Sequence, residues 1–378
     1  MYTCGVFIDL EKAFDTVNHE ILLSKLNYYG IRGIANTWFA SYLSERHQSV
    51  RINGEISTNR LITCGVPQGS ILGPLLFLIY INDMHLAVKK STIYHFADDT
   101  NLLHSCKTLK ELRKIMNNDL KLLYDWLCAN RLSLNTGKTE FIIFRPPRSS
   151  CHERITLLLN RTKLFESTKI KYLGLLLDNK LDWKAHVSEL SKKLSRSIGL
   201  LSKIKPFCTL SVLRSLYFSL FNSHLSYGLS VWGGNISDSL LNRLKVLQNR
   251  ILRIMFPSKH ENPIHCAEIR KSMRILTIED QLKFQSSSLM WDYDHDSLPE
   301  HLSNYFKRSN LVHNYETRGA VQGNLFYSKV NTASYGIKSF KFQGVKTLNK
   351  LLNKDFYKNA KSKVSFLKNL KSEFISQY

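Results

Sequence analysis

The order of hydrophobic patterns along the chain predicts an α+β fold, in which an antiparallel sheet carries helices on one face and a helical region follows. A short apolar run from Val6 ends in the carboxylate of Asp9, which indicates a strand. Two further short strands are predicted on either side of Asp98 and Asp99. Leu109–Leu127 then has apolar residues at helical spacing. Strands and amphipathic helices in this order favour a sheet with helices packed against it.

The first helix and the first hairpin follow from spacing and turn chemistry. Directly after Asp9, apolar residues recur three or four positions apart, which predicts a helix through Phe14, Val17, Ile21, Leu22 and Leu26. Ser49–Ile56 alternates around the dipeptide Asn53-Gly54, which strongly favours a two-residue hairpin turn.

Glycine and proline mark the later turns of this half. Gly65–Gly73 contains three glycines and one proline, so we expect a loop that leads into a buried apolar helix ending at Ile81. Leu134–Phe144 is predicted as a strand that is entered through the turn Asn135–Lys138. Arg145–Ser150 is rich in Pro, Arg and Ser and is expected to be a surface connection.

The C-terminal half is predicted to be mainly helical. After a strand at Ile170–Leu177, one apolar stripe has helical spacing and consists of Trp183, Val187, Leu190, Leu194, Ile198 and Leu201. Similar patterns at Leu210–Phe221 and Leu240–Phe256 complete a small helical bundle. Lys341–Tyr378 contains nine Lys and two acidic residues, a local net charge of +7. We therefore expect domain boundaries that give residues 1–180, 181–256 and a basic C-terminal region, 257–378.

The charge of the chain favours a polyanionic partner. Lys and Arg total 53 against 30 Asp and Glu, a formal net charge of +23, which fits nucleic acid better than a small acidic substrate. The longest apolar stretch, Ile71–Ile81, is too short to cross a bilayer, so no membrane partner is expected.

The compartment is expected to be the nucleus or the cytoplasm, because no secretory signal opens the chain. The cysteines include no CxxC pair and no zinc-like spacing, and we interpret them as reduced, mostly structural thiols. They are Cys4, Cys64, Cys106, Cys128, Cys151, Cys208 and Cys266.

Three carboxylates carry the sharpest chemical prediction. Pairing of their strands would bring Asp9, Asp98 and Asp99 together at one edge of the sheet. Close carboxylates repel unless a positive charge lies between them, and hard oxygen ligands suit Mg²⁺. Two such ions would activate an attacking 3′-hydroxyl and stabilise a leaving pyrophosphate. For Asp98-Asp99 alone, a solvated turn is the commoner explanation.

Five segments occur in one order and together carry a resemblance. They are FIDLEKAFDTVNH (7–19), GVPQGSILGPLLF (65–77), FADDTNLL (96–103), LNTGKTEFIIF (134–144) and KYLGLLLD (171–178). In this order and spacing, they resemble motifs A to E in the palm of reverse transcriptases from non-LTR (LINE-like) retrotransposons, which include the jockey group. Residues 181–186, 225–233 and 313–318 also resemble that family, so the resemblance covers most of the chain.

The resemblance implies a reverse transcriptase palm with residual fingers elements in residues 1–180 and a helical thumb in 181–256. It makes Asp9 and Asp98 the principal ligands of two Mg²⁺ ions, for which Mn²⁺ can substitute, and Asp99 the second carboxylate of the turn. Phe14 falls where relatives place an aromatic steric gate against the 2′-hydroxyl of a ribonucleotide. By periodicity alone, Phe14 is instead a helix-packing side chain.

Further roles follow from the resemblance. Gln68 and Gly69 match the loop that lies along the incoming nucleotide and template, although the same residues also suit a simple tight turn. Lys138 matches a general acid that protonates pyrophosphate; the alternative is an exposed turn lysine. Tyr172, Leu173 and Gly174 resemble the primer grip, a hairpin whose backbone positions the primer 3′ end; by pattern alone, the segment is an ordinary buried strand.

A basic set after residue 180 is expected to follow the phosphate backbone of the primer and template, although charged helix faces are usually just solvated. Its members are Lys192, Lys193, Arg196, Lys203 and Lys205.

Two functions remain open at this point. The first is an RNA-directed DNA polymerase that takes an RNA template, a DNA primer and dNTPs. The second is a catalytically inactive retrotransposon remnant that binds nucleic acid. Because motif A begins within ten residues of Met1, the fingers region and the endonuclease of the family are expected to be missing, as in a truncated copy. An RNA-templated RNA polymerase is disfavoured by Phe14, and no protein partner is predicted.

Overall fold

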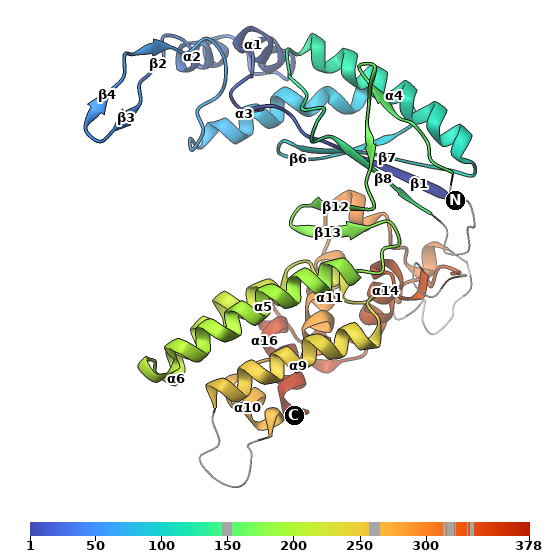
Figure 1. Ribbon diagram of the computed structural model, residues 1–378. Helices are drawn as coiled ribbons and strands as arrows, with labels where there is room; N and C mark the ends of the chain where they lie inside the picture. Colours follow the sequence, from blue (N-terminus) through green and yellow to red (C-terminus); the bar gives the residue numbers. More distant parts are fainter. Residues whose placement is uncertain are drawn as a thin grey trace. The chain divides into compact units, whose positions relative to one another are not determined.

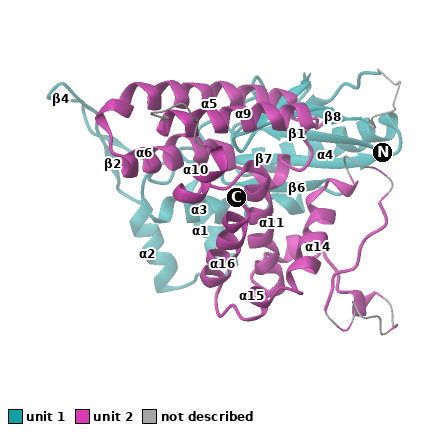
Figure 2. Cartoon of the chain, turned by 90° about the horizontal axis from the view of Figure 1, so that it is seen from below, with its two compact units in different colours: residues 1–180 teal, residues 181–378 magenta. Residues whose placement is uncertain are grey.

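The computed structural model describes residues 1–145, 153–256, 265–312, 315, 321, 323–330, 332 and 336–378. The chain divides into two compact units, Met1–Lys180 and Leu181–Tyr378 (Figure 2). Most of the Pro/Arg/Ser stretch 146–150 and most of the family-like segment 313–318 lie outside the described residues.

The first unit is built on a five-stranded sheet with the order β11-β8-β1-β7-β6 (Figure 1). Its strands are β1 (Tyr2–Ile8), β6 (Thr92–Phe96), β7 (Asp99–Cys106), β8 (Glu140–Phe144) and β11 (Phe165–Glu166). The predicted strands at Val6, on both sides of Asp98-Asp99 and before Phe144 are confirmed. Antiparallel pairing holds from β8 to β6, but β11 pairs parallel to β8, so the expectation of a purely antiparallel sheet is wrong at that edge. The connection between β8, which ends at Phe144, and β11, which begins at Phe165, is long enough for the crossover that parallel strands require.

The helices of the first unit form one hydrophobic core with the sheet, and Figure 1 shows α4 lying along it. They are α1 (His19–Tyr28), α2 (Ile34–Leu43), α3 (Leu72–Ile81), the 3₁₀ helix η1 (Asn82–Leu86) and α4 (Leu109–Ala129). All of them contribute buried residues, α2 through Leu43 and η1 through Met84. The side chain of Thr108 caps α4 by accepting from the N–H of Glu111, and the predicted apolar stripe of α4 is buried.

The first helix begins later than its apolar spacing predicts. Asn18 caps α1 by accepting from the N–H of Ile21, so the helix starts at His19. Phe14 therefore lies in a turn before the helix, so its predicted place within the helix is wrong, although its ring does pack on a helix, against Phe77 of α3. The helix predicted up to Ile81 is confirmed as α3, although Leu75 and Leu78 are exposed, so only one face is buried.

Short hairpins complete the first unit. They consist of β2 (His47–Gln48) with β5 (Arg60–Leu61), β3 (Arg51–Ile52) with β4 (Glu55–Ile56), β9 (Leu158–Leu159) with β10 (Thr162–Lys163), and β12 (Lys169–Tyr172) with β13 (Leu175–Asp178). The turn predicted at Asn53-Gly54 is confirmed, and both residues have positive φ. The single strand predicted at Ile170–Leu177 is wrong, because the chain reverses at Leu173-Gly174, where φ is +45° and +79°.

The second unit is helical within its described residues. Its helices are α5 (Lys184–Ile204), α6 (Leu210–Leu216), α7 (Ser223–Ser226), α8 (Leu229–Trp232), α9 (Asp238–Met255), α10 (Cys266–Met273), α11 (Ile278–Asp294), α12 (Glu300–Ser303), α14 (Phe340–Leu351), α15 (Asp355–Lys358) and α16 (Lys363–Ser376). Shorter helices are η2 (Lys205–Phe207), η3 (Tyr217–Asn222) and η4 (Ser309–Leu311). The stripe predicted on α5 is buried, as expected.

Two family-like segments of this unit meet in an aromatic cluster. His186 lies edge-on to Trp183, with ring centroids 6.0 Å apart, and to Trp232, at 5.2 Å. Burial, together with the charge of Lys193, lowers the pKa of His186, which favours a neutral ring inside the cluster. The cluster fixes the start of α5 against α8.

The described cysteines and helices add two observations. None of the six cysteines in the described ranges forms a disulfide. Over the same ranges, no helix combines the length and the apolar character that a membrane crossing requires.

Candidate active site

Strand pairing brings Asp9 next to Asp98 and Asp99. The β1–β7 register pairs Ile8 with Thr100, so Asp9 follows the last paired residue of β1 just as Asp99 precedes Thr100 on β7. The β6–β7 hairpin turns through Ala97 and Asp98, and Ala97 has a φ of +53°. Such a conformation is uncommon for a residue with a Cβ atom and fits a strained functional turn.

The three carboxylates act on one another electrostatically. Partial burial, and then the negative charges of Asp98 and Asp9, raise the pKa of Asp99. Within the described residues, no hydrogen bond reaches the three carboxylates, and no group of three or more His, Cys, Asp or Glu side chains is arranged to hold a metal ion. The described residues therefore concentrate negative charge here without an ion pair to any of the three carboxylates.

The turn that begins at Asn135 holds the backbone of Asp9 in place. The sequence analysis noted this turn only as the entry to a strand and as the position of Lys138. The N–H of Asp9 donates to Oγ1 of Thr139 at 3.3 Å, and its carbonyl accepts from the N–H of Asn135 at 2.9 Å. Thr139 is fully buried, and its hydroxyl also donates to the carbonyl of Asn135 at 2.9 Å. Asn135 and Thr139 were not predicted as site residues, although both lie in the segment that contains Lys138.

A small pocket of about 170 Å³ opens beside these groups. Its walls include Asp9, Asp99 and Lys138, which the sequence predicted to act together, and also Glu140 and Lys171, which it did not. Lys138 is exposed on its turn, where its N–H is hydrogen-bonded to Asn135 at 3.2 Å. Two lysine side chains thus lie near the carboxylate cluster.

The hairpin β12–β13 also reaches this pocket. Tyr172 lines it, and the ring of Tyr172 packs edge-on against Phe7 with centroids 5.2 Å apart. Burial, and then the charge of Asp99, raise the pKa of Tyr172. The hairpin turn at Leu173-Gly174 is thereby anchored to the sheet close to the carboxylates.

The loop before α3 is joined to the turn after Asp9. Phe14 stacks on Phe77 of α3 with centroids 4.5 Å apart, and its carbonyl accepts from the N–H of Val66 at 2.8 Å. A Cβ atom at Gly65 would lie 2.8 Å from the carbonyl oxygen of Asp15, so only glycine permits this approach. The segments that contain Phe14 and Gln68 therefore form one packed assembly.

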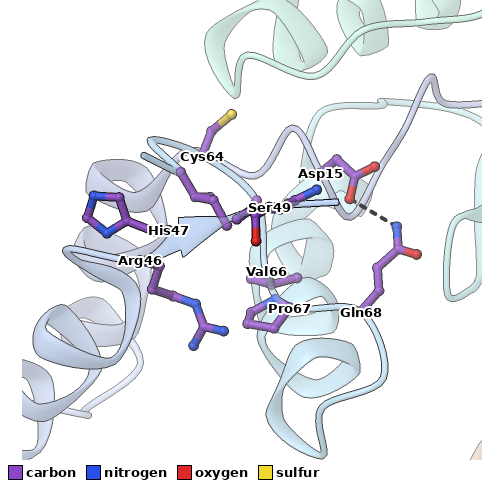
Figure 3. Close-up of a pocket in the computed structure, with 11 residues that line it drawn as sticks. Asp15, Arg46, His47, Ser49, Cys64, Val66, Pro67 and Gln68 are labelled. Carbon is purple, nitrogen blue, oxygen red and sulfur yellow. Dashed lines mark hydrogen bonds between the residues drawn. The ribbon is translucent and has the colours of Figure 1, made fainter. Parts of the chain in front are cut away.

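A larger pocket of about 820 Å³ adjoins this assembly (Figure 3). Gln68 and Asp15 are turned toward one another at its edge, and Nε2 of Gln68 donates to Oδ1 of Asp15 at 3.0 Å. Arg46 and His47 also line it. Next to Gln68, Gly69 has a φ of +82°, with nothing within 4 Å of a Cβ atom built there. Asp15, Arg46 and His47 escaped the sequence analysis because their role depends on a tertiary contact.

The predicted basic set lies in the second unit. Lys192, Lys193, Arg196 and Lys203 are exposed on α5, and Lys205 is half-buried in η2. Lys192 forms an ion pair with Glu189 at 2.8 Å, which neutralises part of the set.

Comparisons with known proteins agree with the geometry of the first unit. Residues 1–177 match the family described as reverse transcriptase (RNA-dependent DNA polymerase). A probable RNA-directed DNA polymerase from transposon BS of Drosophila melanogaster is 29% identical over 302 residues, which are 76% of this chain and 32% of the relative. The RNA-directed DNA polymerase from mobile element jockey of the same species is 30% identical over 269 residues, 67% of this chain and 28% of the relative.

The chain thus spans about a third of the length of these curated relatives. Among solved structures, a telomerase from Candida albicans in complex with a telomeric RNA fragment is 12% identical, with a TM-score of 0.41 over 74% of this chain and 44% of that one. Residues 1–177 therefore belong to the reverse transcriptase family, and the chain is similar to the RNA-directed DNA polymerases of the BS and jockey mobile elements.

Proposed function

We propose that the chain is the polymerase portion of a non-LTR retrotransposon reverse transcriptase, which adds dNTPs to a primer 3′-hydroxyl on an RNA template. The observation that carries the proposal is the β1–β7 pairing, which puts Asp9 beside Asp98 and Asp99. In this proposal residues 1–180 are the palm with residual fingers elements, 181–256 the thumb, and 257–378 a basic C-terminal region.

The donor set fits Mg²⁺. Asp9 and Asp98 would be the principal ligands and Asp99 the second carboxylate of the turn, and all three offer hard oxygens that no hydrogen bond in the described residues satisfies. Mg²⁺ commonly takes only one or two protein carboxylates and completes its shell with water and substrate phosphates. The lack of a larger ligand group therefore agrees with a site that the nucleotide completes. Two bound ions, Mg²⁺ or Mn²⁺, would activate the 3′-hydroxyl and neutralise charge on the departing pyrophosphate.

The neighbouring side chains would orient the nucleotide and move a proton. Lys138, at the pocket of Asp9 and Asp99, would protonate the pyrophosphate. Phe14 would exclude a ribose 2′-hydroxyl, because its ring is held against Phe77 and cannot move aside without breaking that stack. Gln68 and Gly69 would lie along the nucleotide.

The primer and template would be held by elements further along the chain. The turn of Tyr172, Leu173 and Gly174 would place the primer end, since the hairpin packs on Phe7 next to Asp9. The exposed basic residues of α5 would contact phosphates without reading sequence.

The test is primer extension by the purified chain on an RNA template, with dNTPs or NTPs and with Mg²⁺ or Mn²⁺. We expect extension with dNTPs that Asp98→Asn abolishes. Binding of primer and template without extension under either metal would instead identify an inactive nucleic-acid-binding remnant. Extension with NTPs alone would contradict the steric role of Phe14.

A further inference from the structure

A groove in the second unit has no part in the proposed polymerase site. It is lined by residues of α11, α14, α15 and α16 and has a volume of about 290 Å³. Helices α14 and α16 each pack against α11, and all three are labelled in Figure 1. Its lining residues are Lys283, Ser287, Gln343, Lys346, Thr347, Lys350, Leu351, Lys354, Phe356, Leu370, Glu373 and Phe374. Four lysines thus face one acidic residue across a largely apolar floor.

The lysines differ in how far they are already neutralised. Lys354 pairs with Glu373 at 2.9 Å, and Lys283 pairs with Asp280 at 3.0 Å. Lys346 and Lys350 are exposed and form no ion pair within the described part of the chain. They lie four residues apart on α14, a spacing at which like charges repel and destabilise a helix. An anion bound between the two lysines would relieve this repulsion.

The floor of the groove offers aromatic and polar groups to a ligand. Phe356 and Phe374 are partly exposed, and Phe356 stacks on the buried Phe366 with rings 12° from parallel. Because Phe356 also lines the groove, part of its ring is accessible to a planar group. Gln343 and Thr347 add an amide and a hydroxyl that can hydrogen-bond.

We propose that this groove binds single-stranded nucleic acid, with a phosphate on Lys346 and Lys350 and a base against Phe356. Lysines that track a backbone beside aromatic stacking surfaces are the usual means of binding single strands. The volume lies at the lower end of small-ligand sites, which begin at roughly 300 Å³, so it suits a single nucleotide and is too small for a duplex. An acidic peptide would satisfy the lysines, but it would leave the aromatic floor without a planar partner.

The experiment measures binding of a fluorescein-labelled ten-nucleotide oligo(U) to the full chain by anisotropy, in EDTA and over a range of salt concentrations. Lys346→Gln with Lys350→Gln should weaken binding and reduce the slope of log affinity against log salt by about 0.7, since each phosphate neutralised on a single strand contributes roughly 0.7. Lys358→Gln with Lys361→Gln is the matched control, because these exposed lysines line no part of the groove and carry the same charge.

Phe356→Leu separates stacking from charge. It should weaken oligo(U) binding at least about fivefold without changing the salt slope, because stacking of a base on an aromatic ring is largely independent of salt. Thermal unfolding of each variant checks that the packing on Phe366 survives, and Lys346→Gln with Lys350→Gln tests the groove without disturbing that packing.

Three results would overturn the inference. Equal losses of oligo(U) affinity in the two double-lysine variants would mean that binding depends on the overall positive charge and not on the groove. Displacement of oligo(U) by polyglutamate at lower concentration than by unlabelled oligo(U) would identify an acidic peptide as the ligand, and equal binding of a blunt RNA duplex would exclude single-strand selectivity. Primer extension is read separately with Asp98→Asn, so failure of the polymerase proposal leaves the binding result intact.

Discussion

Carboxylates lie in opposite surroundings on the two sides of strand β6. The fully buried carboxylate of Asp119, on α4, accepts hydrogen bonds from the backbone N–H groups of the residues just before the strand, Lys89, Lys90 and Ser91, at 3.3, 3.1 and 2.8 Å. Burial acts to raise the pKa of Asp119, but the hydrogen bonds, led by that of Ser91, outweigh it and lower the pKa.

Just after the strand, Asp98 and Asp99 have no such donors. Partial burial and the charges of Asp98 and Asp9 raise the pKa of Asp99. Natural sequences keep a charged group in unfavourable surroundings where function requires it. Where the fold depends on a charged group, they supply it with hydrogen-bond partners. The contrast therefore indicates that Asp119 serves stability, whereas the carboxylates of the turn serve chemistry.

The largest expected effect comes from Asp98, in the turn after β6. Asp98→Asn should lower primer extension by about a thousandfold, because metal-bound charge stabilisation contributes several kcal/mol. Its free energy of unfolding should stay the same or rise, because one repelling charge is removed. Asp125→Asn, on the exposed face of α4, makes the same chemical change elsewhere and should leave both quantities unchanged. If the Asp98→Asn chain still extended the primer, the carboxylates of the turn would not serve the chemistry.

Substitution of Asp119 should have the opposite effect, with stability lost and primer extension retained. Asp119→Ala leaves three backbone N–H groups without their acceptor and should lower the free energy of unfolding by about 3 kcal/mol, measured by urea denaturation. Extension per folded molecule should be retained. A loss below about 1 kcal/mol would show that water replaces the carboxylate and that Asp119 is not a structural requirement.

The sequence predicted those parts of the fold that depend on local patterns. The strands around Asp98-Asp99, the long helix α4 and the turn at Asn53-Gly54 follow from alternation, helical spacing and turn chemistry. Asp98 and Asp99 stood out because the surrounding segment resembles a known family.

The missed features depend on tertiary contacts or on unusual backbone conformations. The helix start was placed too early because apolar spacing continues through Val17, whereas the Asn18 cap sets the boundary. The hydrophobic pattern alone missed the β12–β13 turn because Leu173 adopts positive φ, which its residue type disfavours, whereas the resemblance to the primer grip implied a hairpin there. Asp119 and Thr139 act through partners far along the chain, and no pattern in the sequence marks such pairs.

The pH dependence of stability should distinguish Asp119 from an uncharged replacement. The pKa of Asp119 is lower in the folded protein, so its stabilising contribution is complete above the ordinary carboxyl pKa and is lost as pH falls through the lowered value. In Asp119→Asn this contribution is absent at every pH. The difference in unfolding free energy between the two chains should therefore shrink from about pH 7 to about pH 3, as measured by urea denaturation. A constant difference would mean that the charge of Asp119 is immaterial.

The smallest expected effect concerns Asp15, an exposed carboxylate that is neither buried like Asp119 nor crowded like Asp99. Its hydrogen bond to Gln68, at 3.0 Å, fixes the orientation of the amide, which makes Asp15 a positioning residue. Asp15→Ala should raise the KM for dNTPs about fivefold with little change in kcat, because one exposed hydrogen bond contributes about 1 kcal/mol. Asp15→Asn should recover part of the loss, since its carbonyl oxygen still accepts. Glu20→Ala, which removes an exposed acid on α1, is the control. A fall in kcat at constant KM would instead assign Asp15 to the chemical step and extend the functional cluster beyond the three aspartates.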